Sequence, residues 1–343
     1  MKILLGMSGG LDSTYAAVKL KNEGHTVEGA VLLMHDYTEI EAAKAAAESV
    51  AIPLHTIDCR AAFESKVIEN FVDEYLSGRT PNPCIVCNSE VKFRFLLNFA
   101  LANGFDKIAT GHYARIVKRD DNGFTRYAVA RAADRSKDQT YVLWRLPQDI
   151  LSHLLFPLSS GEKKEIRIDA RKIGLFVADR DESQEICFIP SGDYADFIEN
   201  RTHPLPHGYF INNEGKILGE HKGIIHYTVG QRKGLGIAMG KRIFVTAINP
   251  EDNTVTLSFD DSYSDTVHIS DMVFSGMPDM LPGEKIALYV KLRYLAAPVS
   301  CVLEYAGEGQ GIVRLSAPVR AVTPGQSAVF YDGDVLAAGG FIR

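Results

Sequence analysis

The sequence predicts an α/β domain built on a doubly wound parallel sheet, followed by smaller β-rich domains. Three observations support this prediction. The chain has 343 residues, more than one core usually needs, so two or three domains are expected. Residues 1–115 alternate between strand-like and helix-like stretches, which is typical of a parallel sheet covered by helices. From about residue 204, Gly, Pro and short β-rich runs replace the helical pattern.

Each N-terminal element follows from its own pattern. The apolar run Lys2–Gly6 predicts a buried parallel strand, and a helix over Asp12–Glu23 is expected to end at Gly24, a frequent C-terminal cap. Further strands are predicted at Thr26–Leu33, Leu54–Ile57 and Lys107–Thr110. Further helices are predicted at Glu39–Val50, Phe63–Leu76 and Ser89–Asn103.

The pattern changes after residue 111. Tyr113–Lys118 and Phe124–Ala130 flank Asp120-Asp121-Asn122-Gly123, a sequence typical of a hairpin turn. Helical stretches are expected around 138–153 and 162–174. The later strand candidates are Arg242–Ile248, Thr254–Ser258, Lys285–Leu292, Ser300–Tyr305, Gly311–Leu315 and Ala328–Tyr331. Short strands separated by regular turns suggest small barrels or sandwiches. The changes in composition and pattern along the chain predict domain boundaries near residues 200 and 270.

The composition excludes several classes of protein. Hydrophobic residues make up 46% and charged residues 23%, which is ordinary for a globular protein. No apolar run approaches the roughly 20 residues of a membrane helix, and the start of the chain is too short an apolar stretch for a signal peptide. A cytoplasmic protein with no membrane partner is therefore expected.

The charge is distributed unevenly along the chain. The net charge of −6 argues mildly against a nucleic-acid partner. However, residues 201–245 contain seven Lys and Arg residues in total and only two acidic residues, both Glu. This segment therefore has a net charge of +5, and the rest of the chain has −11. An acidic protein with such a basic segment can still bind a polyanion through that segment. A basic surface that only contacts solvent explains the charge of the segment equally well.

A glycine-rich loop joins the first predicted strand to the first helix. Backbone N–H groups and the positive end of a helix converge at such a turn, and Gly9 and Gly10 allow close approach of an anion. Ser8 and Ser13 add hydroxyl donors, and Asp12 could hold Mg²⁺ beside a pyrophosphate. Taken by itself, the stretch is also compatible with a plain turn capped by serine.

Five cysteines, at positions 59, 84, 87, 187 and 301, do not form a disulfide framework. Two prolines precede the C-x-x-C of Cys84 and Cys87, and a helix capped by Asn88 or Ser89 is expected to follow. Cys87 would then lie just outside a helix N-terminus, which favours the thiolate and a nucleophilic role. Half of a structural zinc site is the alternative, but no second C-x-x-C exists.

Three cysteines give weaker signals. Cys187 lies between Ile186 and Phe188, an environment that ordinarily indicates a buried core cysteine. Cys59 and Cys301 have no functional pattern around them.

The loop Ser8-Gly9-Gly10-Leu11-Asp12-Ser13 resembles the S-G-G-x-D-S loop of the PP-loop ATP pyrophosphatases, whose members split ATP between its α and β phosphates. Together with other stretches it resembles the tRNA-specific 2-thiouridylases of the MnmA family. The stretches with the resemblance are Gly6–Ser13, Arg79–Phe93, Thr110–Ala114, Lys137–Tyr141, Glu182–Ile189, Gly223–Ala238 and Arg293–Tyr294. The most distinctive string is His226-Tyr227-Thr228-Val229-Gly230-Gln231-Arg232-Lys233-Gly234-Leu235-Gly236.

The resemblance implies an architecture and residue roles. The fold would be a PP-loop domain (adenine nucleotide alpha hydrolase-like) at 1–200, a small central tRNA-binding domain at 201–270 and a C-terminal β-barrel at 271–343. Cys87 would be the nucleophile and Cys187 the persulfide carrier. ATP would contact Gly6, Met7, Ser8, Gly9, Gly10, Leu11, Asp12, Ser13, Met34 and Gly111. The tRNA would meet His112, Lys137, Asp138, Gln139, Arg293, Tyr294 and Gln326.

The resemblance also implies a reaction: ATP-dependent 2-thiolation of the wobble uridine, with ATP and Mg²⁺ as cofactors. The implied partners are the anticodon arm of tRNA and a donor protein that carries a persulfide. Cys87 would either release sulfide from the persulfide or form a disulfide with Cys187. The sequence departs from the family at Cys84, where Asp is common, and in a short loop after Met34. Cys84, Cys87 and Cys187 could instead hold a [4Fe–4S] cluster, although the persulfide route is favoured.

Two rival functions remain at this point. One is another enzyme with the same loop, which either amidates a carboxylate or thiolates a different tRNA position. The other is a non-catalytic RNA-binding protein with a Cys–metal site. The paired cysteines and the 226–236 string argue against the amidating enzymes.

Overall fold

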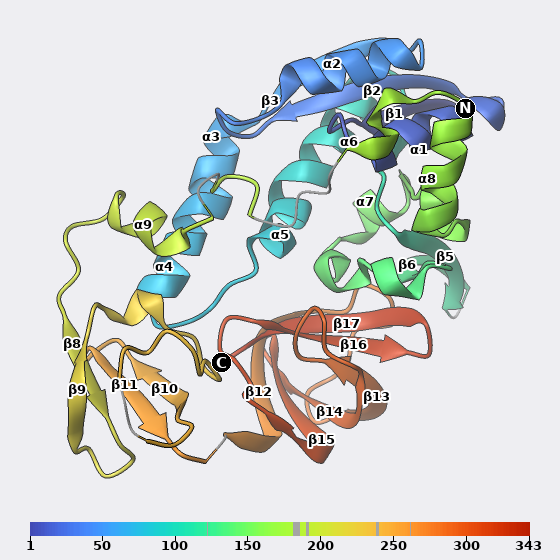
Figure 1. Cartoon of the computed structure of the whole chain (residues 1–343). Coiled ribbons are helices and arrows are strands. Elements are labelled where there is room, and N and C mark those ends of the chain that lie inside the picture. The colour runs from blue at the N-terminus through green and yellow to red at the C-terminus, as the bar shows by residue number, and fades with distance from the viewer. Residues whose placement is uncertain (122, 181–185, 190–191, 238–239, 261) are drawn as a thin grey trace.

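The computed structural model describes residues 1–121, 123–180, 186–189, 192–237, 240–260 and 262–343. Figure 1 shows a helix-covered sheet that holds the N-terminus, and two β-rich parts side by side beneath it. The predicted fold class is confirmed: a parallel-sheet domain, a middle domain and a C-terminal β-barrel. In the described residues, none of the helices combines the length and apolar character needed to cross a membrane.

A parallel sheet of five strands forms the centre of the N-terminal part. Its strands are β1 (Lys2–Gly6), β2 (Thr26–Leu33), β3 (Leu54–Asp58), β4 (Lys107–Ala109) and β7 (Leu154–Leu155). Their order is β3-β2-β1-β4-β7, and every neighbouring pair is parallel. The order reverses between β1 and β4, so loops at the carboxyl ends of these two strands border the crevice where ligands bind in such sheets.

Helices cover both faces of this sheet. The side chains of Ile3 and Leu5 pack in one apolar cluster with α1 (Leu11–Asn22), α2 (Ile40–Ser49) and α8 (Lys163–Lys172). Leu4 points to the opposite face, as strand alternation requires. The helices on that face are α3 (Arg60–Phe63), η1 (Glu64–Ile68), α4 (Glu69–Leu76) and α6 (Phe93–Ala102).

Two predicted helices differ from the structure. The helix expected from Ser89 begins six residues earlier, as α5 (Pro83–Val86), and continues through the π-helical turn η2 (Cys87–Lys92) into α6. The helical stretch expected around 138–153 is broken into short pieces. These are η3 (Arg135–Lys137), η4 (Thr140–Leu143) and α7 (Gln148–Leu151).

The middle part is a four-stranded sheet in the order β10-β11-β8-β9. Its strands are β8 (Gly208–Ile211), β9 (Ile217–His221), β10 (Phe244–Asn249) and β11 (Thr254–Ser258). The remaining helical turns of the described chain are η5 (Pro157–Ser160), η6 (Phe176–Asp179), α9 (Tyr194–Glu199) and η7 (Ile224–His226).

The C-terminal part is a closed barrel in the order β12-β15-β14-β13-β16-β17, with β17 pairing back to β12. The strands are β12 (Tyr263–Val273), β13 (Lys285–Lys291), β14 (Val299–Gly307), β15 (Gln310–Arg320), β16 (Ser327–Asp332) and β17 (Val335–Ile342). Its interior is a separate apolar cluster that includes Leu303 and Phe330. Closure pairs each of these described strands on both sides, which protects the sheet from edge-to-edge association.

The predicted hairpin is present and joins the N-terminal part to the barrel. Its strands β5 (Ala114–Asp121) and β6 (Phe124–Arg131) extend the barrel sheet beside β17, where Val335 pairs with Ala130. Trp144 completes this contact, because its indole N–H donates to Ser327 Oγ at 3.1 Å. The indole lies so close to Gly339 that a Cβ there would come within 2.4 Å of it.

Candidate active site

The Ser8–Ser13 loop lies between β1 and α1, at the carboxyl edge of the parallel sheet. Ser13 Oγ accepts from Ser8 N–H at 3.2 Å and donates to the Gly10 carbonyl at 3.2 Å. Gly9 has φ of 78°, which favours glycine, and a Cβ there would lie 2.7 Å from the backbone of Ala42. The loop is therefore held in one shape by its own hydroxyls and by the start of α2.

Two neighbouring segments complete the surroundings of this loop. Gly111 follows β4, and a Cβ on it would lie 2.9 Å from the backbone of Asp12 and Ser13. Arg180 donates to the Gly9 carbonyl at 3.1 Å and pairs with Glu39, which precedes α2. Three elements distant in sequence thus surround a loop of six residues.

A buried lysine contacts the loop carboxylate. Lys163 Nζ lies 2.6 Å from both carboxylate oxygens of Asp12, and the lysine is 6% exposed. Tyr113 also donates its hydroxyl to Asp12 Oδ1 at 2.9 Å. The carboxylate side chain itself remains 34% exposed, so it is still accessible at the surface of the site.

The cysteine pair lies inside a helix, which corrects the prediction that Cys87 precedes one. Asn82 is the N-cap, its side chain accepting from Cys84 N–H at 3.1 Å, and Pro83 occupies the first helical position. Cys87 begins the π-helical turn one turn further along. The backbone N–H groups at the start of α5 could stabilise a thiolate. However, the N–H of Cys84 is hydrogen-bonded to Asn82, and Cys87 lies one turn further along the helix.

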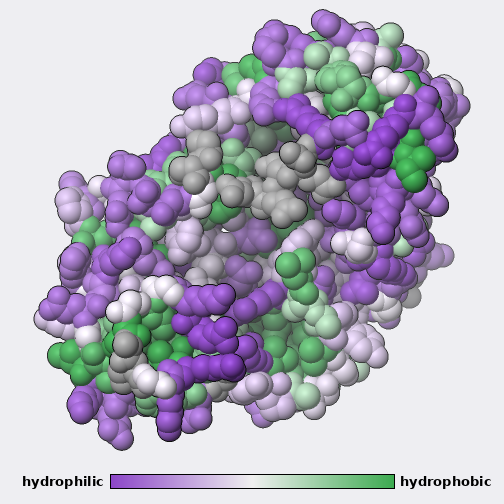
Figure 2. Space-filling view, viewed as in Figure 1, coloured by the Kyte–Doolittle hydropathy of each residue, from purple (hydrophilic) through white to green (hydrophobic). Residues whose placement is uncertain are grey.

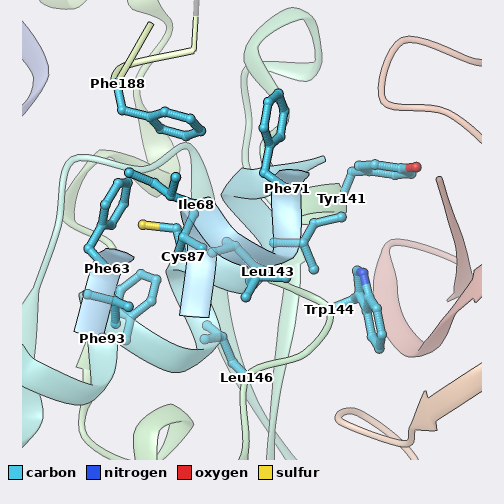
Figure 3. Packing of buried hydrophobic residues seen from close by; sticks show 14 of the residues in the cluster. Phe63, Ile68, Phe71, Cys87, Phe93, Tyr141, Leu143, Trp144, Leu146 and Phe188 are labelled. Carbon is cyan, nitrogen blue, oxygen red and sulfur yellow. The ribbon is translucent and has the colours of Figure 1, made fainter. Parts of the chain in front are cut away.

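Cys87 is buried in an apolar cluster. Figure 3 shows its sulfur among the rings and side chains of Phe63, Ile68, Phe93 and Phe188, which belong to the same cluster. Its thiol donates to Met34 Sδ at 3.8 Å. Burial raises the pKa of Cys87 to about 12, and the nearby Lys92 lowers it only in part. In this conformation the thiol is neutral at pH 7.

Cys187 lies within electrostatic range of Cys87, although the two residues are 100 positions apart in the sequence. It is exposed, while Phe188 and Ile189 beside it are buried, so the interpretation of Cys187 as a core cysteine was wrong. Its surroundings still raise its pKa by desolvation, and Lys92 acts on it as on Cys87. Cys84 is exposed and lies within electrostatic range of both other thiols.

The three cysteines do not form a metal site as they are placed. In the described residues, no group of three or more His, Cys, Asp or Glu side chains converges on a point where a metal ion could sit. All five cysteines are free thiols, and Cys59 and Cys301 are buried. Among the described residues, Cys84, Cys87 and Cys187 are therefore not placed to bind one metal ion together.

Several residues expected to meet tRNA make internal contacts. His112 bonds Thr110 Oγ1 through Nδ1 at 2.8 Å, and burial lowers its pKa to about 3, so it is neutral at pH 7. Asp138 accepts from Thr140 N–H and lies 3.5 Å from Arg131. Gln139 accepts from Tyr113 N–H at 2.8 Å. Lys137 ends the turn η3 beside them.

The remaining predicted tRNA contacts lie where the three parts of the chain meet. Arg293 Nη2 donates to the Ala321 carbonyl at 2.6 Å and to the Val229 carbonyl of the middle part. Gln326 donates to the Thr80 carbonyl at 2.7 Å, close to the cysteine pair. Tyr294 packs edge-on against Tyr141 with ring centroids 5.9 Å apart.

The basic segment forms an exposed surface on the middle part. Arg232, Lys233, Lys241 and Arg242 are all exposed. Three of these cations, Arg232, Lys241 and Arg242, line an open depression of about 590 Å³. Figure 2 shows the molecule hollowed between the PP-loop domain and the two β-rich parts, with hydrophilic residues over much of the surface around it.

Sequence reasoning missed three residues of this site. Lys163 and Arg180 contact the loop from more than 150 residues away, and no local motif marks either of them. Tyr113 lies in the resembling stretch Thr110–Ala114 and at the start of the predicted hairpin, but it was given no role at the site. Strand β4 brings it to the loop, so the parallel-sheet topology was the available signal.

Models of known families match three consecutive parts of the chain. Residues 1–191 match the "tRNA methyl transferase HUP domain", 195–258 the "tRNA methyl transferase PRC-barrel domain" and 264–342 the "Aminomethyltransferase beta-barrel domain". The first two descriptions name tRNA as the substrate of a methyl transfer, and the third names an aminomethyl transfer.

The full-length relatives carry one name. A tRNA-specific 2-thiouridylase MnmA of Acetivibrio thermocellus is 43% identical, covering 100% of this chain and 99% of that protein. The protein of the same name from Carboxydothermus hydrogenoformans is also 43% identical, with coverage of 100% and 97%. Among solved structures, a 4-thiouridine synthetase in complex with RNA and ATP aligns with a TM-score of 0.38 at 17% identity, over 55% of this chain and 44% of that one.

Proposed function

The chain belongs to the MnmA family of tRNA-specific 2-thiouridylases, and on that basis we propose that it replaces O2 of the wobble uridine in tRNA with sulfur at the expense of ATP. The observation that carries this proposal is the 43% identity over the full chain. The contact between Met34, beside the nucleotide loop, and Cys87 supports it, because activation and sulfur delivery must occur at one base. Division into domains at 1–200, 201–270 and 271–343 is part of the proposal.

Activation makes the oxygen of the uridine replaceable. The C2 oxygen attacks the α phosphorus of ATP, the bond from that phosphorus to the β-phosphate oxygen breaks, and pyrophosphate leaves. The Ser8–Ser13 loop would hold the departing pyrophosphate through its N–H groups and hydroxyls. Asp12 would hold Mg²⁺, which commonly takes one or two carboxylates with phosphate oxygens and supplies charge neutralisation there.

Sulfur transfer then uses two thiols. The terminal sulfur of a persulfide on Cys187 attacks C2, the bond from C2 to oxygen breaks, and AMP leaves. Cys87 attacks the inner sulfur, so that the 2-thiouridine sulfur is released and a Cys87–Cys187 disulfide forms. In the alternative order, Cys87 releases sulfide first and the sulfide attacks C2. Both orders oxidise the two cysteines, so an external thiol must reduce them before the next turnover.

Burial of Cys87 imposes a condition on this step. A thiol with a pKa of about 12 is a poor nucleophile at pH 7, because almost none of it is ionised. Binding of tRNA and nucleotide would therefore have to change the surroundings of Cys87 before it attacks. Such a change would keep the nucleophile inactive until the substrate is present.

The partners follow from the exposed groups. The cations Arg232, Lys233, Lys241 and Arg242 would hold phosphates of the anticodon arm. The other residues predicted to meet tRNA would shape the adjoining surface. His112, Asp138, Gln139, Arg293 and Gln326 would do so through their internal bonds, and Lys137 and Tyr294 would contact the RNA. The exposed Cys187 would receive sulfur from a donor protein that carries a persulfide. We place the reaction in the cytoplasm, where tRNA and ATP are available.

Pyrophosphate exchange tests the activation step. We expect labelled pyrophosphate to enter ATP only when tRNA is present, because the adenylate forms on the tRNA itself. AMP should accumulate once a persulfide donor is added. Absence of both exchange and AMP, with tRNA binding intact, would favour the rival of a non-catalytic RNA-binding protein.

A further inference from the structure

The nucleotide loop has no positive charge of its own. In the stretch Gly6–Ser13 the single charged side chain is Asp12, which is negative, whereas the triphosphate of ATP carries a charge of about −4. Backbone N–H groups and hydroxyls stabilise phosphates but do not neutralise them. Positive charge must therefore reach this loop from another part of the chain or from a metal ion.

We propose that Lys163 is the phosphate-binding cation of this loop, which pairs with Asp12 in the free enzyme and contacts the β- and γ-phosphates of bound ATP. The inference rests on the proposed function, since it assigns a further residue to the same ATP site. Lys163 opens α8, and its backbone N–H is held by Asp134 Oδ2 at 2.9 Å. The start of its side chain is thus fixed, and four methylenes separate this anchored end from the ammonium.

Stability alone gives little reason for this lysine. Apart from the contact of this lysine with Asp12 and the hydrogen bond from the Tyr15 hydroxyl to Asp169, the helices α1 and α8 meet through apolar side chains such as Ala16, Ala17, Ile166 and Ala170. Replacement of a buried ion pair by apolar residues of similar volume is often neutral or stabilising. A lysine that is 6% exposed and bonded to both oxygens of a loop carboxylate therefore indicates a role beyond packing.

The pairing explains how the loop is kept ready for ATP. Without nucleotide, Asp12 neutralises Lys163, and Tyr113 fixes the carboxylate with a third hydrogen bond. When phosphates arrive, their oxygens replace the carboxylate as partners of the ammonium. The released carboxylate can then take part in holding Mg²⁺. The exchange never leaves the lysine buried without a counter-charge.

The test compares binding of inorganic pyrophosphate and of AMP by calorimetry, in EDTA and then with Mg²⁺. Lys163→Met should weaken binding of pyrophosphate and ATP at least tenfold and leave AMP binding within twofold. Lys163→Arg should recover part of the loss, because the charge is retained. Lys172→Met is the matched control, since Lys172 lies on the same helix, is exposed and pairs with Asp169. It should bind all three ligands like the wild type.

A double-mutant cycle separates phosphate binding from support of Asp12. In the Asp12→Asn background, Lys163→Met should still weaken pyrophosphate binding. An effect that vanishes in this background, or an equal loss of AMP and pyrophosphate binding, would overturn the inference. Wild-type binding of pyrophosphate by Lys163→Met would overturn it too, with the proposed function intact. A wild-type enzyme that binds no pyrophosphate would overturn both, whereas one that binds it but never thiolates tRNA would overturn the proposed function alone.

Discussion

Cys87 lies against Met34, with the two sulfur atoms 3.8 Å apart although the residues are separated by 53 positions. Met34 follows β2 at the carboxyl edge of the parallel sheet, on the side of the nucleotide loop. Cys87 lies on the helix that follows the two prolines, near the junction with both β-rich parts. This contact links the nucleotide side of the site to the thiol side.

Alkylation should distinguish the three cysteines. Cys84 and Cys187 are exposed, whereas Cys87 is buried and its pKa is raised to about 12, so its thiol is protonated at pH 7. We expect iodoacetamide at pH 7 to label Cys84 and Cys187 well before Cys87, as measured by peptide mass spectrometry. Addition of tRNA and a non-hydrolysable ATP analogue should protect Cys84 and Cys187. Equal labelling of Cys87 in the free enzyme would contradict the described burial.

Substitution should separate activation from sulfur transfer. Asp12→Ala removes the loop carboxylate that contacts Lys163 and that would hold Mg²⁺, so AMP formation should be abolished. Cys87→Ser should still release pyrophosphate from ATP but yield no 2-thiouridine, because a serine hydroxyl cannot reduce a persulfide. The measurements are AMP release and nucleoside analysis on the same samples. Near-normal thiolation by Cys87→Ser would show that the nucleophile lies elsewhere.

Charge reversal should identify the tRNA surface. Lys241 and Arg242 are exposed beside the open depression on the middle part. Changing both to Glu should weaken tRNA binding and reduce the slope of log K against log[salt] by about one unit for each phosphate that the protein no longer neutralises. Binding of ATP should not change.

A second reversal controls for net charge. Lys44 on α2 and Lys285 on β13 are exposed and lie outside the depression. The Lys44→Glu/Lys285→Glu protein has the same net charge as the first variant and should bind tRNA with nearly the wild-type affinity. Equal effects of the two double variants would remove the basic segment from the interface.

The packing of the PP-loop domain against the barrel should be sensitive at one glycine. A Cβ at position 339 would come within 2.4 Å of the Trp144 ring, so Gly339→Ala should reduce the free energy of unfolding by about 1–3 kcal/mol. Trp144 is the single tryptophan of the chain, and its fluorescence reports directly on this packing. Unchanged stability and an unchanged emission maximum would show that the two parts are not packed as described.

The role of Cys84 can be tested by changing it to the Asp that is common in the family. The persulfide route uses only Cys87 and Cys187, so Cys84→Asp should retain thiolation with a persulfide donor. Anaerobic reconstitution with iron and sulfide, followed by absorption and EPR spectra, checks the alternative. A reconstituted cluster that activity requires would overturn the persulfide mechanism.

The sequence predicted elements whose signal is local and missed those that depend on the fold. The loop Ser8–Ser13 and strands β1 to β4 follow from short patterns, and their predicted bounds agree with the structure within a few residues. Strand β17 was missed, because Gly339 and Gly340 lie in its interior and glycine argues against a strand. The tertiary contact with Trp144 requires one of these glycines, which no sequence pattern shows.

Helix starts and distant ion pairs illustrate the same limit. Asn82 followed by Pro83 is a typical start of a helix, and the helix does begin there. The two prolines are equally compatible with a rigid loop that precedes a later helix, and this interpretation was wrong. That error moved Cys87 to a helix end and led to a lowered pKa being expected, whereas burial raises it. The pair of Asp12 and Lys163 spans 151 positions and depends on how α8 packs against α1.

The central claim is tested most directly by mass spectrometry of nucleosides from unmodified tRNA incubated with the enzyme, Mg-ATP and a persulfide donor. We expect 2-thiouridine at the wobble position, formed in equal amount to AMP and absent when ATP is omitted. A thiolated nucleoside at another position, or a methylated one, would contradict the claim. So would consumption of ATP without any sulfur in the tRNA.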